Sequence, residues 1–247
     1  MILYVNGDSH SAGAEAAVPY NSISEDPAFN HCTISRAAHP KNVEVCYGRH
    51  LANNLGADLY MDAVSGGSNQ RIIRTTKEFV ESHMTEDIFV VIGWAIVDRA
   101  EIYHNGEYHC LSAGSYIPRP LEEQFKQWVL NHNQTESEKA VDSHNQICQL
   151  HRYLLDKNIK HLFFNTVSMG WDRIPNSSRI DWTGHYLNPY NANFSYFSIL
   201  RGAGFTHAVW PNRQGNGDHF GRDAHLHWAE FLLPYIKEKR HRSAVCV

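Results

Sequence analysis

The sequence predicts a three-layer α/β/α domain built on a mainly parallel, five-stranded sheet. Strand-like and helix-like stretches alternate along the chain, and the strand-like runs 88–92 and 162–164 are continuously apolar. Such alternation requires crossover connections between parallel strands, and strands covered by helices on both faces are apolar throughout. No repeat, low-complexity segment or linker interrupts the 247 residues, so we expect a single domain over 1–247.

Local signals define the expected elements. Gly56 suits a helix C-cap, Ser68 suits an N-cap, and Pro234 is expected to kink or interrupt the last helix. The dipeptide Asn105-Gly106 is typical of a two-residue turn, which predicts a hairpin over 101–111. The expected strands are 1–7, 58–67, 87–94, 160–167 and 207–210, and the expected helices are 47–56, 68–83, 134–158, 194–205 and 223–239.

Composition narrows the class of function. The chain has 43% hydrophobic and 19% charged residues, as soluble globular proteins do, and its net charge of −4 gives no basic field for nucleic acid or an anionic membrane. The basic run 237–242 (KEKRHR) is expected to end a helix, where cations suit the dipole. The five cysteines form no CxxC pair, which argues against a disulfide framework or a structural zinc site. No signal peptide or membrane-spanning run is visible, so a cytoplasmic protein without membrane association is expected.

Polar, glycine-containing segments follow several of the expected strands. They are 7–10 (GDSH) after the first, 65–69 (SGGSN) after the second, and 215–225 (GNGDHFGRDAH) before the last helix. Ligands of open α/β sheets bind at the carboxyl ends of the strands. A serine hydroxyl becomes a nucleophile when a base takes its proton, and backbone N–H groups in glycine-rich turns can hold the developing oxyanion. These segments supply the parts that acyl transfer needs, although each is a weak signal when taken alone.

The order of the three segments resembles the SGNH, or GDSL-like, hydrolase superfamily. The GDSH start, the GGSN helix opening and the IGW strand end (92–94) are similar to divergent phage and bacterial members. The resemblance implies a flavodoxin-like fold and an esterase-type activity. It also implies that Ser9 is the nucleophile and its N–H an oxyanion donor, that Gly66 or neighbouring Gly67 is a second donor, and that His219 is the base.

This sequence departs from the family pattern at two places. Asn216 stands where the family has an aspartate three residues before the histidine. Either Asp218 orients His219 through a different turn, or Asn216 does, or the site is a Ser–His dyad. The family's asparagine after the third strand is also absent, and Asn69 is a candidate replacement for its amide. Loss of one oxyanion donor without a substitute would raise the barrier by roughly 3–4 kcal/mol.

Other polar residues near the expected strand ends have simpler interpretations. Asp8 is expected to cap backbone N–H groups in its own turn, and Arg99 and Glu101 are expected as solvated surface charges. His225 and His227 are two apart on the last helix and point away from each other, so we expect no metal and no cofactor. The GDS turn is not expected to bind phosphate, because the sequence has no GxGxxG motif and no lysine near this turn.

The sequence thus predicts a serine hydrolase that cleaves a small ester through an acyl-enzyme. The acyl group is expected to be acetyl or similar, carried by a small molecule or a glycan, because the long loops are polar and aromatic. Trp94, Trp171 and Trp182 are the expected substrate contacts. The alternative is an SGNH-fold binding or structural protein with weakened or lost catalysis. The acyl group, the alcohol and the oligomeric state stay open.

Overall fold

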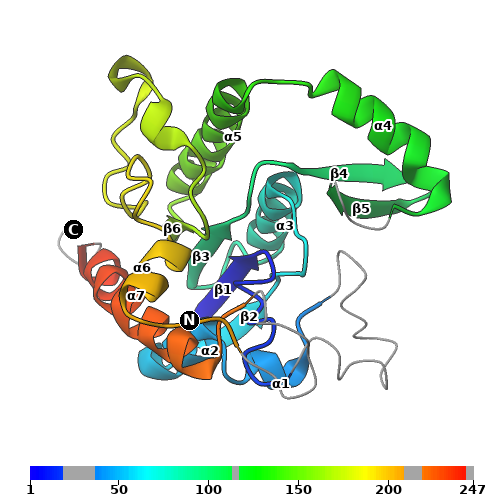
Figure 1. Ribbon diagram of the computed structural model, residues 1–247. Helices are drawn as coiled ribbons and strands as arrows, with labels where there is room; N and C mark the ends of the chain where they lie inside the picture. The colour runs from blue at the N-terminus through cyan, green and yellow to red at the C-terminus, as the bar shows by residue number, and fades with distance from the viewer. Residues whose placement is uncertain (19–36, 113–116, 209–218, 243–247) are drawn as a thin grey trace.

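The centre of the molecule is a parallel sheet of four strands in the order β2-β1-β3-β6. The computed structural model, shown in Figure 1, describes residues 1–18, 37–112, 117–208 and 219–242. In the register, Tyr4 of β1 lies between Tyr60 of β2 and Val90 of β3. This order is the first four positions of the flavodoxin-like sheet. The strands are β1 (Ile2–Gly7), β2 (Asp58–Met61), β3 (Ile88–Trp94) and β6 (Lys160–Asn165).

The expected fold class is confirmed, with four parallel strands in the described part of the chain. The expected fifth strand, 207–210, lies partly outside the described residues. Within them, His207 forms only an isolated antiparallel bridge with Phe220. This bridge lies beside the residues that lead into the last helix.

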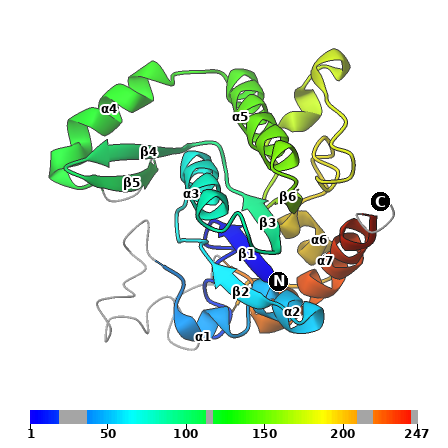
Figure 2. The ribbon, with the colours of Figure 1, turned by 180° about the vertical axis from the view of Figure 1, so that it is seen from behind.

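Helices cover both faces of the sheet, and the strands are apolar on both sides. Tyr4 and Val90 belong to the core cluster on one face, whereas Leu3 and Val91 belong to the cluster on the other, as period-two alternation requires. Figures 1 and 2 show the sheet between the two helical layers. One layer consists of α3 (Asn69–Ser82) and α5 (Glu136–Asp156), and the other of α2 (Tyr47–Leu55), α6 (Tyr196–Gly202) and α7 (Arg222–Arg242).

The helix ends follow the local signals in the sequence. Gly56 ends α2 in the left-handed conformation with φ 59°, and the Ser68 side chain accepts a hydrogen bond from the Arg71 N–H at the start of α3. Pro234 was expected to kink or interrupt the last helix; α7 continues through this residue without interruption. No helix in the described part of the chain is both long and apolar enough to cross a membrane.

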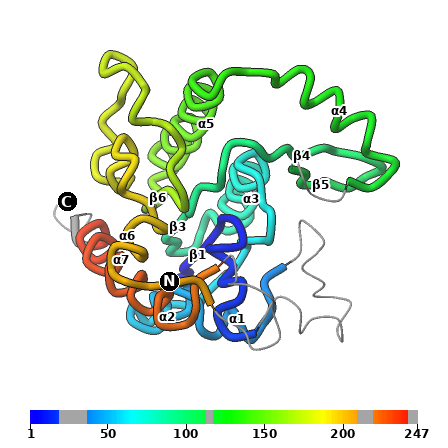
Figure 3. The backbone as a smooth tube through the Cα atoms, viewed as in Figure 1, coloured from blue at the N-terminus to red at the C-terminus, as the bar shows by residue number. Residues whose placement is uncertain are grey.

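A smaller lobe extends from the sheet between β3 and α5. It holds the predicted hairpin, whose turn residues Asn105 and Gly106 both have positive φ, 49° and 89°, as a type I′ turn requires. Figure 3 shows the chain passing from this lobe through α4 to α5, and then from β6 along a long segment to α6. The remaining elements are β4 (Arg99–His104), β5 (Glu107–Ser112), α4 (Glu122–Asn131), α1 (Pro40–Val43) and the short 3-10 helices Arg119–Leu121, Trp171–Arg173 and Asn176–Ser178.

Candidate active site

The site begins where β1 ends at Gly7. This residue has φ 152°, a conformation that glycine alone adopts readily. A Cβ at this position would lie 2.3 Å from Ser11 Oγ and 2.7 Å from the carbonyl oxygen of Gly93 in the next strand. The close approach of β1, β3 and the following turn therefore requires a glycine. It directs the chain out of the sheet immediately before Ser9.

Backbone hydrogen bonds fold the residues after Gly7 into a series of tight turns. The Ala12 N–H donates to the carbonyl of Asp8 at 2.9 Å, and the Ala14 N–H donates to the carbonyl of Ser9 at 2.9 Å. The Asp8 side chain accepts the N–H of His10 at 3.0 Å, which confirms the capping role expected for it. Ser9 is thereby fixed at the carboxyl edge of the sheet, where β1 adjoins both β2 and β3.

The Ser9 hydroxyl lies at one end of a chain of hydrogen bonds that joins both ends of the sequence. His219 Nε2 is 2.8 Å from Ser9 Oγ, and His219 Nδ1 is 3.0 Å from Glu15 Oε2. The same carboxylate oxygen accepts the backbone N–H of His219 at 3.2 Å. Since an ionised carboxylate only accepts, Nδ1 carries the proton and Nε2 is left to accept the serine proton. All three residues are buried.

Glu15 is a residue that the sequence reasoning missed. Asn216 and Asp218 were expected to orient His219, but both lie outside the described residues. The ring nitrogen that such a residue would hold, His219 Nδ1, is bonded to Glu15. A signal was present, because Glu15 is the one charged residue in the small, apolar stretch 11–18 (SAGAEAAV).

The backbone of Glu15 is held in the left-handed region with φ 63°. Such a conformation costs a non-glycine residue about 1–3 kcal/mol and is concentrated at functional sites. Its side chain is fully buried, and the carboxylate accepts hydrogen bonds from the backbone N–H and the ring Nδ1–H of His219. The turn is therefore strained in a way that places a carboxylate behind the imidazole.

Two further histidines lie near the site in neutral form. The ring of His10 is 4.8 Å from that of His219, and burial lowers the pKa of His10 to about 4. His225 is on α7, as expected, and burial lowers its pKa to about 3. Its Nδ1 accepts the backbone N–H of Tyr47 at 3.4 Å. Neither ring adds a positive charge beside His219 at neutral pH.

The backbone N–H groups of Ser9 and Gly66 have no acceptor among the described residues. Gly66 has φ 69°, which favours glycine. The N–H of Gly67 instead donates to the carbonyl of Val64 at 3.1 Å, and a Cβ on Gly67 would lie 2.9 Å from the carbonyl oxygen of Gly7. Of the two glycines proposed from the sequence, Gly66 is therefore the one with an uncommitted donor.

The amide of Asn69 connects two strand ends. Its Nδ2 donates to the carbonyl of Ala95 at 3.0 Å, and its Oδ1 accepts the Ala95 N–H at 3.0 Å. One of its two N–H donors and its carbonyl are thus used to fix the chain after β3. This leaves a single N–H for any contact with an oxyanion.

Arg99 is a second residue that the sequence analysis placed differently. It was expected as a solvated charge, but its Nη1 lies 3.1 Å from Asp8 Oδ2 and donates to the carbonyl of Gly67 at 3.0 Å. The Asp8 side chain is 2% exposed, so this ion pair is largely removed from water. Glu101 is also paired, with Arg74 at 2.6 Å. Arg99 therefore ties the turn after β1 to the glycine turn after β2.

The three tryptophans expected to contact substrate are core residues instead. Trp94, Trp171 and Trp182 are 0%, 1% and 4% exposed and belong to the cluster beneath α3 and α5. The indole N–H of Trp171 donates to Ser143 Oγ at 3.0 Å, and that of Trp182 to the Tyr190 hydroxyl at 3.1 Å. The indole nitrogen of Trp94 is buried without a hydrogen-bond partner among the described residues. Because all three indoles are buried, no indole face is available to a ligand.

Fold and geometry together define the class: an α/β protein with a buried serine–histidine–carboxylate arrangement at the carboxyl edge of a parallel sheet. Among the described residues, no group of three or more His, Cys, Asp or Glu side chains is placed to hold a metal ion. The chain belongs to a family of unknown function (DUF6071), which matches residues 21–241. The matched span begins after Ser9 and Glu15.

Comparison with known proteins finds similarity to solved structures. Eleven solved chains match, among them the crystal structure of a Corynascus thermopiles (Myceliophthora fergusii) carbohydrate esterase family 2 enzyme with its carbohydrate-binding domain. The TM-score is 0.46 and the sequence identity is 15%, over 96% of this chain and 66% of that one. The chain thus spans somewhat less than two thirds of that protein's length. No curated protein matches the sequence.

Proposed function

We propose that the protein is a serine hydrolase that cleaves a small ester through an acyl-enzyme. The observation that supports this most directly is the continuous contact from Ser9 Oγ through His219 to the buried Glu15 carboxylate. It lies beside β1 and β3, where the strand order of an open α/β sheet reverses and ligands bind. The resemblance of the GDSH and GGSN segments to the SGNH superfamily agrees with this position.

In the proposed first step, Ser9 Oγ attacks the ester carbonyl and its proton passes to His219 Nε2. The imidazolium that forms is stabilised by the Glu15 carboxylate, which keeps Nδ1–H directed away from the serine. The protonated Nε2 then gives its proton to the leaving alcohol, and Ser9 becomes acylated. A water molecule, deprotonated by the same nitrogen, attacks the acyl-enzyme, releases the acid and returns the proton to Ser9.

The oxyanion is assigned to the N–H groups of Ser9 and Gly66, with the remaining N–H of Asn69 as the third candidate. Two donors of this kind are sufficient for an oxyanion hole in other acyl-transfer enzymes. The alternative function, an SGNH-fold protein that binds an ester but hardly turns it over, is favoured by the commitment of the Asn69 amide to Ala95. Slow turnover is therefore expected if Asn69 contributes nothing.

A polar cleft next to Arg99 and Asn69 is the proposed place for the alcohol part of the substrate. Its volume is about 80 Å³, which suits a small part of the alcohol. Arg99 connects the cleft to the turn that holds Ser9, through its ion pair with Asp8. Amide and charged side chains dominate the lining, which favours a hydroxyl-rich alcohol such as a sugar. The lining residues are Asn69, Gln70, Val97, Arg99, Trp128, His132, Gln134, Lys139, Asp142, Ser143 and Gln146.

The test is covalent labelling with a fluorophosphonate probe, followed by peptide mapping. Stoichiometric labelling at Ser9 is expected, with loss in Ser9→Ala and in His219→Ala. The variant Ser178→Ala, at an exposed serine, is the matched control and is expected to be labelled like the parent chain. Labelling that persists in Ser9→Ala, or a folded parent chain that is never labelled, would refute an activated serine.

Substrate preference is tested with 4-nitrophenyl acetate, 4-nitrophenyl octanoate and a peracetylated sugar. We expect acetate esters to be cleaved and the octanoate to be cleaved much more slowly. Labelling at Ser9 without turnover of any of these esters would support the binding alternative. Faster cleavage of the octanoate would contradict the assignment of a small, polar substrate.

A further inference from the structure

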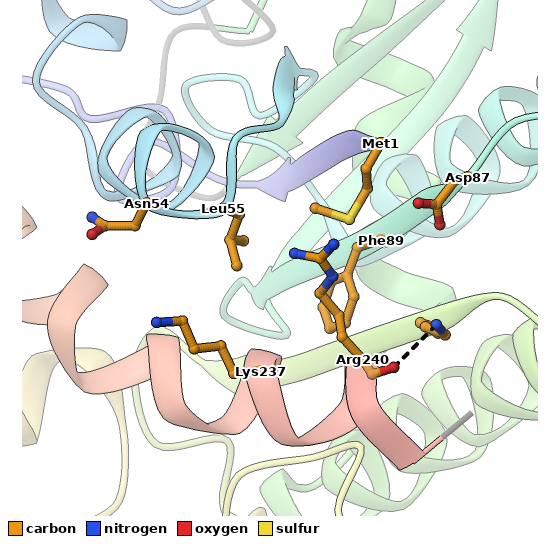
Figure 4. Close-up of a pocket in the computed structure, with 8 residues that line it drawn as sticks. Met1, Asn54, Leu55, Asp87, Phe89, Lys237 and Arg240 are labelled. Carbon is orange, nitrogen blue, oxygen red and sulfur yellow. Dashed lines mark hydrogen bonds between the residues drawn. The ribbon is translucent and has the colours of Figure 1, made fainter. Parts of the chain in front are cut away.

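A basic cleft lies at the end of the sheet opposite to Ser9. It is a cleft of about 450 Å³ between α2, α7 and the amino-terminal ends of the strands. The six residues of β1 separate it from the Ser9 turn, a distance of roughly 20 Å along the strand. Figure 4 shows the cleft. We call it the amino-edge cleft. Its lining residues are Met1, Asn54, Leu55, Asp87, Phe89, Lys160, Lys237 and Arg240.

Three cations from two different elements line this cleft. Lys160 is the first residue of β6, whereas Lys237 and Arg240 are three residues apart on α7 and therefore share one face of the helix. Figure 4 shows the side chains of Lys237 and Arg240 reaching from α7 into the cleft, with Asp87, its one carboxylate, at the far end from Lys237. The side chains of the lining have a formal charge of +2, although the whole chain has a net charge of −4.

These cations are not used in ion pairs within the described residues. Lys160 Nζ donates to the backbone carbonyl of Arg240 at 3.4 Å, which orients it along the cleft without neutralising it. Neither Lys237 nor Arg240 lies within salt-bridge distance of a described carboxylate. Lys239, between them in sequence, is directed elsewhere and donates to the carbonyl of Thr183. Two positive side chains of the KEKRHR run thus face the cleft.

The helix dipole explains part of this arrangement. Cations stabilise the last turns of a helix by about 0.3–1 kcal/mol, and this accounts for the basic residues at the end of α7. It does not account for Lys160, which belongs to a strand, nor for the presence of Lys237 and Arg240 in the lining of the same cleft. A cleft lined by unpaired cations attracts anions.

We propose that the amino-edge cleft binds a small phosphate monoester with an apolar organic part. A phosphate monoester carries about −1.5 to −2 charges at pH 7, which matches the +2 of the lining. The half-buried side chains of Leu55 and Met1 provide apolar surface for the organic part, above the buried ring of Phe89. The volume of about 450 Å³ is within the range of small-molecule sites. This site is independent of the proposed hydrolase activity.

The experiment is isothermal titration calorimetry of the full chain with phenyl phosphate as the probe. Inorganic phosphate and phenol are titrated in parallel to separate the contributions of charge and apolar contact. We expect saturable binding of phenyl phosphate at one site, tighter than that of either part. The double variant Lys237→Gln/Arg240→Gln is expected to weaken binding about tenfold or more, because two charge-assisted contacts are lost.

Two controls make the result specific to this cleft. Lys157→Gln removes an exposed lysine at the end of α5 and is expected to bind like the parent chain, as is Ser9→Ala. Equal weakening in Lys157→Gln, or no saturable binding to the parent chain, would overturn the proposal. Vesicles with and without phosphatidic acid form a further arm. Binding to phosphatidic acid vesicles without binding of phenyl phosphate would assign the charges to a lipid headgroup and overturn the small-molecule ligand.

Discussion

Replacement of Glu15 by glutamine is the most informative test of the proposed mechanism. Glutamine keeps the size of the side chain, so the turn after β1 should be preserved, but it removes the negative charge behind His219. The carboxylate is fully buried, so no water replaces it as a partner for the ring. The expected result is a variant that folds, keeps its affinity for substrate and loses most of its rate.

The magnitude follows from the two hydrogen bonds that Glu15 accepts. The bond from the His219 backbone N–H is the same before and during the reaction, so it does not contribute to the rate. The bond from Nδ1, 3.0 Å in length, becomes a buried ion pair when His219 takes the serine proton. Loss of one partner of a buried ion pair costs about 3–5 kcal/mol. At 1.36 kcal/mol per factor of ten, the expected fall in kcat is roughly 150- to 5,000-fold.

The assay is hydrolysis of 4-nitrophenyl acetate, with the rate of fluorophosphonate labelling at Ser9 as a readout that does not depend on product release. Glu230→Gln, at an exposed glutamate of α7, is the matched control and should leave both rates unchanged. A Glu15→Gln variant with parental kcat and labelling rate would refute the role of the carboxylate. So would an equal loss in Glu230→Gln.

Three further outcomes are expected. Gly7→Ala should lower the free energy of unfolding by about 2–4 kcal/mol in urea denaturation, because the new Cβ would lie 2.3 Å from a neighbouring atom and the residue has φ 152°. The control Gly202→Ala, where a Cβ would meet no atom, should leave this free energy unchanged, and equal effects of the two substitutions would contradict the packing argument. Arg99→Met should lower the free energy of unfolding by about 3–5 kcal/mol, because it leaves the Asp8 carboxylate buried and unpaired. Adding Asp8→Asn should recover part of this loss, and strictly additive effects in the double-mutant cycle would show that the two side chains do not interact. Burial lowers the pKa of His151 to about 4, below its value of about 6.5 when unfolded, so the stability it contributes is complete above pH 6.5 and is lost as the pH falls toward 4. His151→Asn should flatten the pH dependence of unfolding, and an unchanged slope would contradict this assignment.

Patterns of short range predicted much of the fold. Continuous apolar runs identified the strands of the parallel sheet, and the Asn105-Gly106 turn identified the hairpin, because both depend on neighbouring residues alone. The resemblance directed attention to Ser9 and His219, which the structure brings to 2.8 Å from each other. The catalytic roles of these two residues remain predictions.

The burial of single side chains and the pairing of residues distant in sequence could not be predicted from these short-range patterns. Trp171 and Trp182 lie in a polar segment whose composition suits a binding loop, yet that segment packs against α5 and its indoles complete the core. Glu15 was overlooked because its role depends on a left-handed backbone and on a histidine from the other end of the sequence. Arg99 was expected in water because Asp8, its partner, is distant in sequence.

The position of Glu15 has a consequence for when the proposed site is completed. Ser9 and Glu15 lie in one series of turns, but His219, which links them, is 210 residues from Ser9 and 204 from Glu15. Contacts of such long sequence separation form late, because the entropy of closing the loop opposes them. A nascent chain whose residues from 219 onward are still within the ribosome would have Ser9 and Glu15, but no histidine between them. The proposed esterase activity would therefore require the last 29 residues, which supply His219 and also the helix α7 that covers one face of the sheet.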